Sequence, residues 1–337
     1  MKTESAPGLS LVEVPEPEVG PSDVLIEVSQ AAICGTDLHI YQWNEWARET
    51  ISPPVTIGHE FVGRVVKLGA QVSDIDVGQR VAGEGHIICG RCRNCRSGDG
   101  HLCRNTKGVG IHRDGGFAER VVIPAANAYP VPDSIPDDVA AILDPLGNAV
   151  HTALSFDLVG EDVLITGAGP IGQMAAAISR HAGARHVVLP DTRPARLEPA
   201  ARLGATRAIP AGEEHVRRTM TELGMTEGFD IALEMSGSPL AVADILAVVN
   251  HGGKVALLGL FSTAATVDLN QAIFKGLTIK GIYGREMFDT WYKATAMLNS
   301  GLDVTPVISH RFPLAEYETA FDALESGEAS KILLDIG

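Results

Sequence analysis

The chain of 337 residues has few basic side chains, no long apolar run and few cysteines. Lysine and arginine total 27 against 42 acidic residues, giving a formal net charge of −15. Nucleic acids and anionic membranes bind clustered basic side chains, so neither is an expected partner. The longest apolar runs, such as Val255–Phe261, are far shorter than the roughly 20 residues that span a bilayer. Because residues 1–14 hold no signal-peptide core, we expect a cytoplasmic protein.

Five cysteines is an odd number, and four of them lie in one short segment. Cys89, Cys92, Cys95 and Cys103 follow the spacing C-x2-C-x2-C-x7-C in a loop rich in glycine, arginine and asparagine. Four thiolates complete a closed tetrahedral zinc site that stabilises the fold around it. An iron–sulfur cluster is the main alternative, although bacterial ferredoxin motifs end in Cys-Pro and this one does not. A zinc ribbon for nucleic acid is disfavoured by the acidic net charge.

The fifth cysteine, Cys34, has the hydroxyl of Thr36 and the imidazole of His39 within six residues. A catalytic zinc site uses about three protein ligands of mixed type and keeps one position open. His59 and Glu60 offer a nitrogen and an oxygen ligand on adjacent residues. Taken alone, these segments also fit a buried thiol in a turn and a surface pair. The four-cysteine segment leaves Cys34 without a structural partner, and this favours the metal interpretation.

Asp144 lies before Pro145, between two helix-like segments at 137–143 and 148–156. A residue that precedes proline disfavours helical dihedrals. We therefore expect Asp144 at a helix junction, outside both helices. Its carboxylate could reach a metal or cap the next helix, and the sequence leaves both open.

Residues 160 to about 290 alternate short apolar strands with helical patterns, which indicates a parallel sheet. The strand Asp162–Thr166 leads directly into Gly167-Ala168-Gly169-Pro170-Ile171-Gly172 and then a helix. G-x-G-x-x-G in this context is a dinucleotide-binding fingerprint, whose glycines allow a tight turn, close approach of the pyrophosphate and close packing. The N-terminus of the helix supplies N–H groups for the phosphates.

Asp191 lies about twenty residues beyond the last glycine of the fingerprint, where a carboxylate accepts the ribose hydroxyls of NAD and repels the 2′-phosphate of NADP. The nearby Arg193 and Arg196 weaken this preference. Ligands bind at the carboxyl ends of parallel strands. The strands expected at 231–234, 254–259 and 277–283 therefore place residues 235–237, 258–260 and 282–283 near the nicotinamide.

These motifs, together with Val77–Val81, resemble the zinc-containing medium-chain alcohol dehydrogenase family over nearly the whole chain. The resemblance implies an α/β protein of two domains. A GroES-like β-rich catalytic domain would cover residues 1–145 and be completed by 290–337. A Rossmann NAD-binding domain, with a doubly wound parallel sheet, would cover 146–289.

The resemblance also implies two zinc ions per subunit and a set of cofactor contacts. Cys34, His59 and Glu60 would hold the catalytic zinc, and Cys89, Cys92, Cys95 and Cys103 the structural zinc. Thr36, the cofactor ribose and His39 would relay the proton, with Asp144 as a further carboxylate near the metal. The residues implied for binding NAD are Gly167, Gly169, Ile171, Gly172, Asp191, Arg196, Leu258, Gly259, Leu260, Ile282 and Tyr283.

Long runs, among them Ala32–Tyr41, Asp144–Asp157 and Gly281–Phe288, narrow the resemblance to the threonine-oxidising members of the family. This implies NAD-dependent oxidation of L-threonine to L-2-amino-3-oxobutanoate, a step of threonine catabolism towards glycine, by a homotetramer. A polyol or secondary-alcohol dehydrogenase of the butanediol type on the same scaffold is the alternative enzyme. A non-catalytic NAD-binding regulator with only a structural zinc is the alternative of another class.

Overall fold

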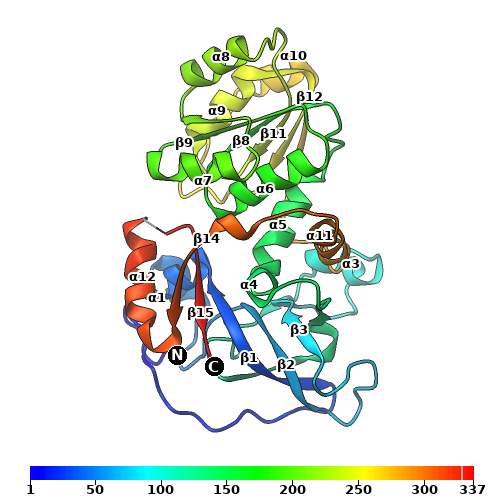
Figure 1. The fold of residues 1–337 in the computed structure, drawn as a ribbon, viewed down its shortest axis with the longest axis vertical. Helices are drawn as coiled ribbons and strands as arrows, with labels where there is room; N and C mark the ends of the chain where they lie inside the picture. Colours follow the sequence, from blue (N-terminus) through cyan, green and yellow to red (C-terminus); the bar gives the residue numbers. More distant parts are fainter. Residues whose placement is uncertain (328) are drawn as a thin grey trace. The chain divides into compact units, whose positions relative to one another are not determined.

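The computed structural model describes residues 1–327 and 329–337. The chain forms two compact units, one of residues 1–144 with 308–337 and one of residues 145–307 (Figure 1). The first unit is built mainly of strands, and the second alternates strands with helices. The predicted α/β class, with a β-rich domain and a doubly wound parallel sheet, is confirmed.

The first unit contains a seven-stranded sheet in the order β14-β15-β1-β2-β3-β7, with β6 also paired to β1. Its strands are β1 (Asp23–Ile33), β2 (Glu60–Leu68), β3 (Arg80–Gly83), β6 (Arg120–Pro124), β7 (Ala128–Pro130), β14 (Ile308–Pro313) and β15 (Lys331–Asp335). All pairs are antiparallel except β14 with β15. The predicted return of the last strand to the first domain is confirmed, because β15 pairs with β1.

Short helices and a small hairpin complete this unit. They are α1 (Gly35–Gln42), α2 (Glu45–Thr50), α3 (Arg93–Arg96), η1 (Gly100–Leu102), η2 (Ala125–Asn127), α4 (Asp137–Ala140), η5 (Leu314–Glu316) and α12 (Tyr317–Ser326), with β4 (His86–Ile87) paired to β5 (Lys107–Gly108). Alternate residues of β1, such as Val24 and Ile26, are fully buried in one apolar cluster. Phe61 of β2 and Phe321 of α12 join that cluster, so strand and helix share one core.

The second unit contains a parallel six-stranded sheet in the order β10-β9-β8-β11-β12-β13. The strands are β8 (Asp162–Thr166), β9 (His186–Asp191), β10 (Arg207–Pro210), β11 (Phe229–Glu234), β12 (Val249–Leu257) and β13 (Thr278–Gly281). The helices are α5 (Leu143–Ala153), which begins two residues before this unit, α6 (Pro170–His181), η3 (Pro194–Arg196), α7 (Leu197–Arg202), α8 (Glu213–Glu222), α9 (Pro239–Val248), α10 (Leu269–Lys275), α11 (Asp289–Asn299) and η4 (Thr305–Val307). The strand order reverses between β8 and β11, the switch point at which such sheets bind ligands.

Helices cover both faces of this parallel sheet. Figure 1 shows α6 and α7 on one side of the strands and α8, α9 and α10 on the other. The central strand β8 is correspondingly apolar in its middle, where Val163, Leu164 and Ile165 are fully buried. A strand covered on both faces needs such a continuous apolar run, which explains why the sequence of β8 lacks alternation.

The return to the first unit comes later than expected. We placed it at residue 290, whereas the structure keeps residues 290–307 in the second unit. The reason is the packing of α11: Trp291 is 1% exposed and lies beside the guanidinium of Arg285, 5.9 Å from ring centroid to Cζ. The boundary expected at residue 145 is nearly that observed, since Pro145 begins the second unit.

The expectation that Asp144 lies outside the helices is wrong. The helix α5 (Leu143–Ala153) includes Asp144, Pro145 and Gly147. Proline is tolerated in the first turn of a helix, where its missing N–H would have no intrahelical acceptor. Asp144 therefore lies in the first turn of α5, where a carboxylate is favoured by the helix dipole.

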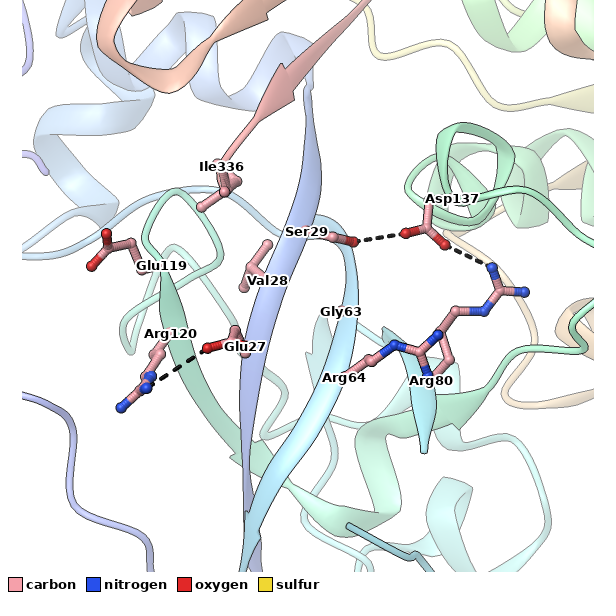
Figure 2. A pocket seen from close by; sticks show the side chains of 11 residues that line it. Glu27, Val28, Ser29, Gly63, Arg64, Arg80, Glu119, Arg120, Asp137 and Ile336 are labelled. Atoms are coloured by element: carbon pink, nitrogen blue, oxygen red, sulfur yellow. Dashed lines mark hydrogen bonds and ion pairs between the residues drawn. The ribbon is translucent and has the colours of Figure 1, made fainter. Parts of the chain in front are cut away.

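The first unit also has a cavity of about 420 Å³ on the sheet, shown in Figure 2. Its charged lining side chains pair largely with one another: Arg80 with Asp137 at 2.6 Å, and Arg120 with Glu27 at 3.7 Å. Ser29 also donates to Asp137, at 3.0 Å. The cavity is lined by none of the predicted site residues, so the candidate site lies elsewhere.

Candidate active site

Cys34 lies where β1 ends and α1 begins. It is the N-cap residue of α1, with extended dihedrals, and its N–H donates to a carboxylate oxygen of Asp37 at 2.9 Å. Thr36 is in the first turn of the same helix, and its Oγ1 lies 3.7 Å from Cys34 Sγ. His39 is exposed one turn further on. Because Thr36 and His39 are three residues apart, they share one face of the helix.

His59 and Glu60 lie at the start of β2. The preceding Gly58 has φ +93°, and a side chain there would collide with the ring of Phe117. Antiparallel pairing of β2 with β1 sets Glu60 opposite Ala32, and this brings the segment close to Cys34. The ligand atoms of Cys34, His59 and Glu60 all lie within 4.8 Å of one another.

Two charged residues that the sequence did not reveal surround this cluster. Lys331 of β15 is 4% exposed, and its Nζ donates to both oxygens of Glu60, at 2.8 and 3.1 Å, and to the carbonyl of Ile33 at 3.0 Å. Asp37 is fully buried, and its Oδ1 lies 3.8 Å from Nδ1 of His59. Lys331 lies on β15, which pairs with β1, and Asp37 lies in the first turn of α1, which follows β1.

The electrostatics of the cluster are those of a cation site. Burial opposes charge on the imidazole, but Asp37 and Cys34 outweigh it and raise the pKa of His59 well above its ordinary value. Burial also raises the pKa of Asp37. Neither His59 Nδ1 nor Asp37 Oδ1 has a hydrogen-bond partner among the described residues. A sulfur, a nitrogen and an oxygen donor with buried, unsatisfied polar atoms fit a zinc ion with one open position.

Asp144 is 5% exposed in the first turn of α5. Its charge contributes to the raised pKa of His59, after the larger effects of burial, Asp37 and Cys34. It is not one of the three residues whose ligand atoms converge in the described chain. The structure therefore places Asp144 near the cluster but not within it.

The four-cysteine segment forms a second converging group. The ligand atoms of Cys89, Cys92, Cys95 and Cys103 lie within 4.8 Å of one another, around α3 and η1. The backbone N–H groups of Cys89 and Asn105 each donate to Cys103 Sγ at 3.3 Å. N–H donors at Arg91 and Cys92 lower the pKa of Cys89 to about 6. Burial and the neighbouring thiols of Cys92 and Cys103 instead raise the pKa of Cys95 to about 12. Four converging sulfurs, of which that of Cys89 favours the thiolate, fit a closed structural zinc site.

The glycine fingerprint lies at the carboxyl end of β8. Gly167 has φ +95°, which favours glycine, and Gly169 is the N-cap of α6, followed by a proline. A Cβ at Gly172 would collide with the carbonyl oxygen of Gly167. Ile171 is in the first turn of α6. The loop thus has the geometry in which a helix N-terminus receives a pyrophosphate.

Asp191 ends β9 beside that loop. One of its oxygens accepts the N–H of Ala168 at 2.6 Å and the other that of Arg193 at 2.7 Å. Arg196 lies 3.8 Å from the same carboxylate. Burial lowers the pKa of its guanidinium, and the charge of Asp191 offsets only part of that effect. The two residues predicted for the adenosine side are therefore together.

The remaining predicted cofactor residues follow the next strands at the same edge of the sheet. Leu258 and Gly259 follow β12, and their N–H groups donate to the carbonyl of Glu234 at 2.9 and 3.1 Å. Leu260 is 95% exposed; Ile282 and Tyr283 follow β13. The buried carboxylate of Glu234 was not predicted: it accepts the N–H groups of Ser236 at 2.8 Å and Gly237 at 2.9 Å and so fixes this loop.

The fold and the two sites that contain cysteine define a class of protein, the zinc- and dinucleotide-dependent dehydrogenases. Comparison with known proteins agrees with this class. Residues 20–133 match the family model of the alcohol dehydrogenase GroES-like domain, and residues 170–300 match that of the zinc-binding dehydrogenases. An L-threonine 3-dehydrogenase of Alteromonas mediterranea is 58% identical over 335 residues, covering 99% of this chain and 98% of that one.

Solved structures agree over the full length. Galactitol-1-phosphate dehydrogenase of Escherichia coli has a TM-score of 0.91 at 25% identity, covering 99% of both chains. An Escherichia coli protein described as a short chain alcohol dehydrogenase complexed with NADH has a TM-score of 0.90 at 26% identity, covering 98% of this chain and 97% of that one.

The chain belongs to the zinc-containing medium-chain alcohol dehydrogenase family. It is an oxidoreductase that uses zinc and NAD, and the predicted cofactors are thereby confirmed. No helix in the described part of the chain has both the length and the apolar character needed to cross a membrane. The individual site residues stay predictions, supported by the geometry above.

Proposed function

We propose that this chain oxidises the side-chain hydroxyl of L-threonine to a ketone, giving L-2-amino-3-oxobutanoate, as one NAD is reduced to NADH and one proton is released. The observation that carries this proposal is the 58% identity with an L-threonine 3-dehydrogenase over 99% of the chain. The convergence of Cys34, His59 and Glu60 within 4.8 Å supports it, since the reaction needs a metal with an open position.

We assign the metal and proton chemistry to the predicted residues. Zinc held by Cys34, His59 and Glu60 would supply a Lewis acid that lowers the pKa of the substrate hydroxyl, and NAD would supply the hydride acceptor. Thr36, 3.7 Å from Cys34 Sγ, accepts the substrate hydroxyl proton as it gives up its own, and the cofactor ribose would carry that second proton to His39. His39, exposed on the same face of α1, delivers it to water.

Asp144 has an electrostatic role in this scheme. It is buried, and its charge acts on His59. A carboxylate beside a ligating imidazole favours metal binding through its charge without making a bond.

In the second unit, the glycine loop would hold the pyrophosphate and Asp191 the adenosine ribose. The Asp191 carboxylate supports a preference for NAD, because it would repel a 2′-phosphate. Its present hydrogen bond to Ala168 fixes it beside the loop. Arg196 lies against the same carboxylate and would line the adenosine pocket.

The substrate is tested by the rate of NADH formation. We expect L-threonine to be turned over faster than butane-2,3-diol or sorbitol. The rival polyol or secondary-alcohol dehydrogenase is favoured only by distant structural neighbours, such as galactitol-1-phosphate dehydrogenase at 25% identity. Faster turnover of a diol or polyol than of threonine would overturn the substrate proposal.

A metal count tests the enzyme against a non-catalytic regulator. Purified protein should contain two zinc ions per chain, one for each of the two groups that contain cysteine. A single zinc bound by the four cysteines, with no turnover of any alcohol, would favour the regulator.

We further propose that the chain forms a homotetramer. The edge strand β13 and the adjacent helix α10 expose a set of large apolar side chains that supports self-association. They are Leu269, Ile273, Phe274 and Ile279, exposed by 64%, 71%, 80% and 43%. Light scattering should give four subunits, and Phe274→Glu should lower that number. A monomeric wild-type protein would refute the proposal.

We propose the cytoplasm as the compartment. All five cysteines are free thiols, and each belongs to one of the two converging groups that contain cysteine. A reducing compartment preserves such thiols. Cell fractionation that recovers the enzyme outside the cytoplasm would contradict this assignment.

A further inference from the structure

The imidazole of His39 is held by a residue that the proposed proton path does not include. The helix α1 ends at Gln42, and Trp43 reverses the chain with a left-handed φ of 54°. Asn44, the next residue, therefore turns back beside α1. Its side-chain Nδ2 lies 3.0 Å from Nδ1 of His39, and its backbone N–H donates to the carbonyl of His39 at 3.3 Å.

The direction of this side-chain hydrogen bond follows from the other end of the amide. Asn44 is the N-cap of α2, and its Oδ1 accepts the N–H of Ala47 at 3.0 Å. A backbone N–H can only donate, so the amide oxygen must face Ala47 and the amide NH2 must face His39. An amide NH2 can only donate. Nδ1 of His39 is therefore the acceptor, and the proton of the neutral ring is on Nε2.

We propose that Asn44 is a positioning residue of the proton path: it holds the ring of His39 in place and fixes the neutral ring as the Nε2–H tautomer. An imidazolium would present Nδ1–H to the amide NH2, donor against donor. To remove this clash, the Asn44 amide would have to rotate so that its oxygen faces His39. Its Oδ1 would then no longer accept the N–H of Ala47, and the cap on α2 would be lost. A proton that His39 takes up is therefore readily passed on to water. The role in catalysis rests on the proposed function, but the tautomer does not.

The groups around the ring are few. The ring of Trp46 on α2 contacts that of His39 edge-on, with centroids 6.3 Å apart. Four charged side chains on the elements packed here contact groups other than the His39 ring. Lys2 lies over the Trp43 ring at 4.7 Å, Asp37 accepts the Cys34 N–H, Arg48 donates to the Trp43 carbonyl, and Glu325 of α12 accepts from Gln42. The other two charged side chains of α2 besides Arg48, Glu45 and Glu49, belong to exposed residues.

Asn44→Asp is the decisive variant. Aspartate has the same shape as asparagine and is an equally good N-cap, but it offers His39 an acceptor where asparagine offers a donor. Asn44→Ser is the matched control: it keeps the cap but is too short to hold the ring. Solid-state nitrogen-15 NMR of histidine-labelled protein identifies the protonated ring nitrogen, and His39→Gln assigns the signal.

We expect neutral His39 to carry its proton on Nε2 in the wild type, on Nδ1 in Asn44→Asp, and on both in Asn44→Ser. A proton on Nδ1 in the wild type, or on Nε2 in the aspartate variant, overturns the inference. If Asn44→Asp does not fold, the test is the comparison of Asn44→Ser with the wild type. Mixed tautomers in Asn44→Ser and a single tautomer in the wild type would support the inference. If Asn44→Ser keeps the single wild-type tautomer, the inference fails.

Turnover supplies the second measurement. The carboxylate of Asn44→Asp stabilises protonated His39, so the acidic limb of the kcat profile should move up by about one pH unit and lower kcat up to about tenfold at acid pH. A reversed tautomer with an unchanged profile would refute the positioning role. If the wild type does not oxidise threonine but the tautomers are as expected, the proposed function fails while the assignment of the His39 proton is upheld.

Discussion

Lys331→Met is expected to destabilise the metal-free protein far more than the zinc-loaded one. The ammonium of Lys331 is buried and donates to both oxygens of Glu60 and to the carbonyl of Ile33. Methionine fills a similar volume but has no charge. The substitution therefore leaves the carboxylate of Glu60, which is 1% exposed, without a compensating cation unless zinc is bound.

The size of the effect follows from the burial of both partners. Breaking a buried ion pair by removing one partner costs about 3–5 kcal/mol, because the other charge is left uncompensated. In a domain of this size each kcal/mol lowers the melting temperature by about 2–4 °C. Metal-free Lys331→Met should therefore melt about 6–20 °C below metal-free wild type. Zinc on Glu60 would replace the lost cation, so the loaded proteins should differ by much less.

The assay is calorimetry of wild type and variant, each with zinc and after removal of zinc by a chelator. Lys331→Arg keeps the charge and should fall between the two. Lys293→Met is the matched surface control, because Lys293 pairs with Asp289 on the exposed face of α11 and such pairs contribute about 0.3–0.5 kcal/mol. Equal shifts of Lys331→Met with and without zinc would show that Glu60 does not ligate the metal.

Three further predictions concern the other sites. Cys34→Ser should abolish turnover and leave one zinc per chain by elemental analysis, and two zinc ions with retained activity would contradict it. Gly172→Ala should abolish NAD binding in calorimetric titration, since its Cβ collides with the Gly167 carbonyl; unchanged affinity would be inconsistent with the loop geometry. Burial and the carboxylate of Asp230 raise the pKa of Glu161. The charge of Glu161 therefore destabilises the fold as pH rises through that pKa. Glu161→Gln should melt at a higher temperature than wild type at pH 8 but not at pH 4.

Local patterns made much of the fold predictable. Val24 and Ile26 alternate with other residues in the period of two that is typical of a strand such as β1, and the strand–glycine–helix sequence around Gly167 predicted the dinucleotide-binding fingerprint. Both signals come from neighbouring residues. The helical placement of Asp144 was missed because proline is tolerated in a first turn as well as at a break. The late return at Ile308 was missed because burial of Trp291 against Arg285 leaves no periodic signal.

The candidate sites were predictable to the extent that their residue types are unusual. Cysteines at fixed spacing and a His–Glu pair stand out in any sequence. Single polar residues do not: Asp37, Asn44 and Glu234 act through a few hydrogen bonds each, and nothing in the composition around them marks those contacts. Lys331 is marked only by its burial in an ion pair with Glu60, and that contact depends on the completed sheet.

The pairing of β1 with both β2 and β15 explains why the first cluster cannot be read as a local motif. Ala32 lies opposite Glu60 in one pair, and Ile33 lies opposite Ile332 in the other. The ion pair of Glu60 and Lys331 therefore joins residues 271 positions apart in the sequence. A metal site is rarely preformed in an unfolded chain, so its binding free energy is also folding free energy. Zinc binding to Cys34, His59 and Glu60 should consequently stabilise the docking of β15, a strand that supplies no ligand, by fixing the partners of Lys331.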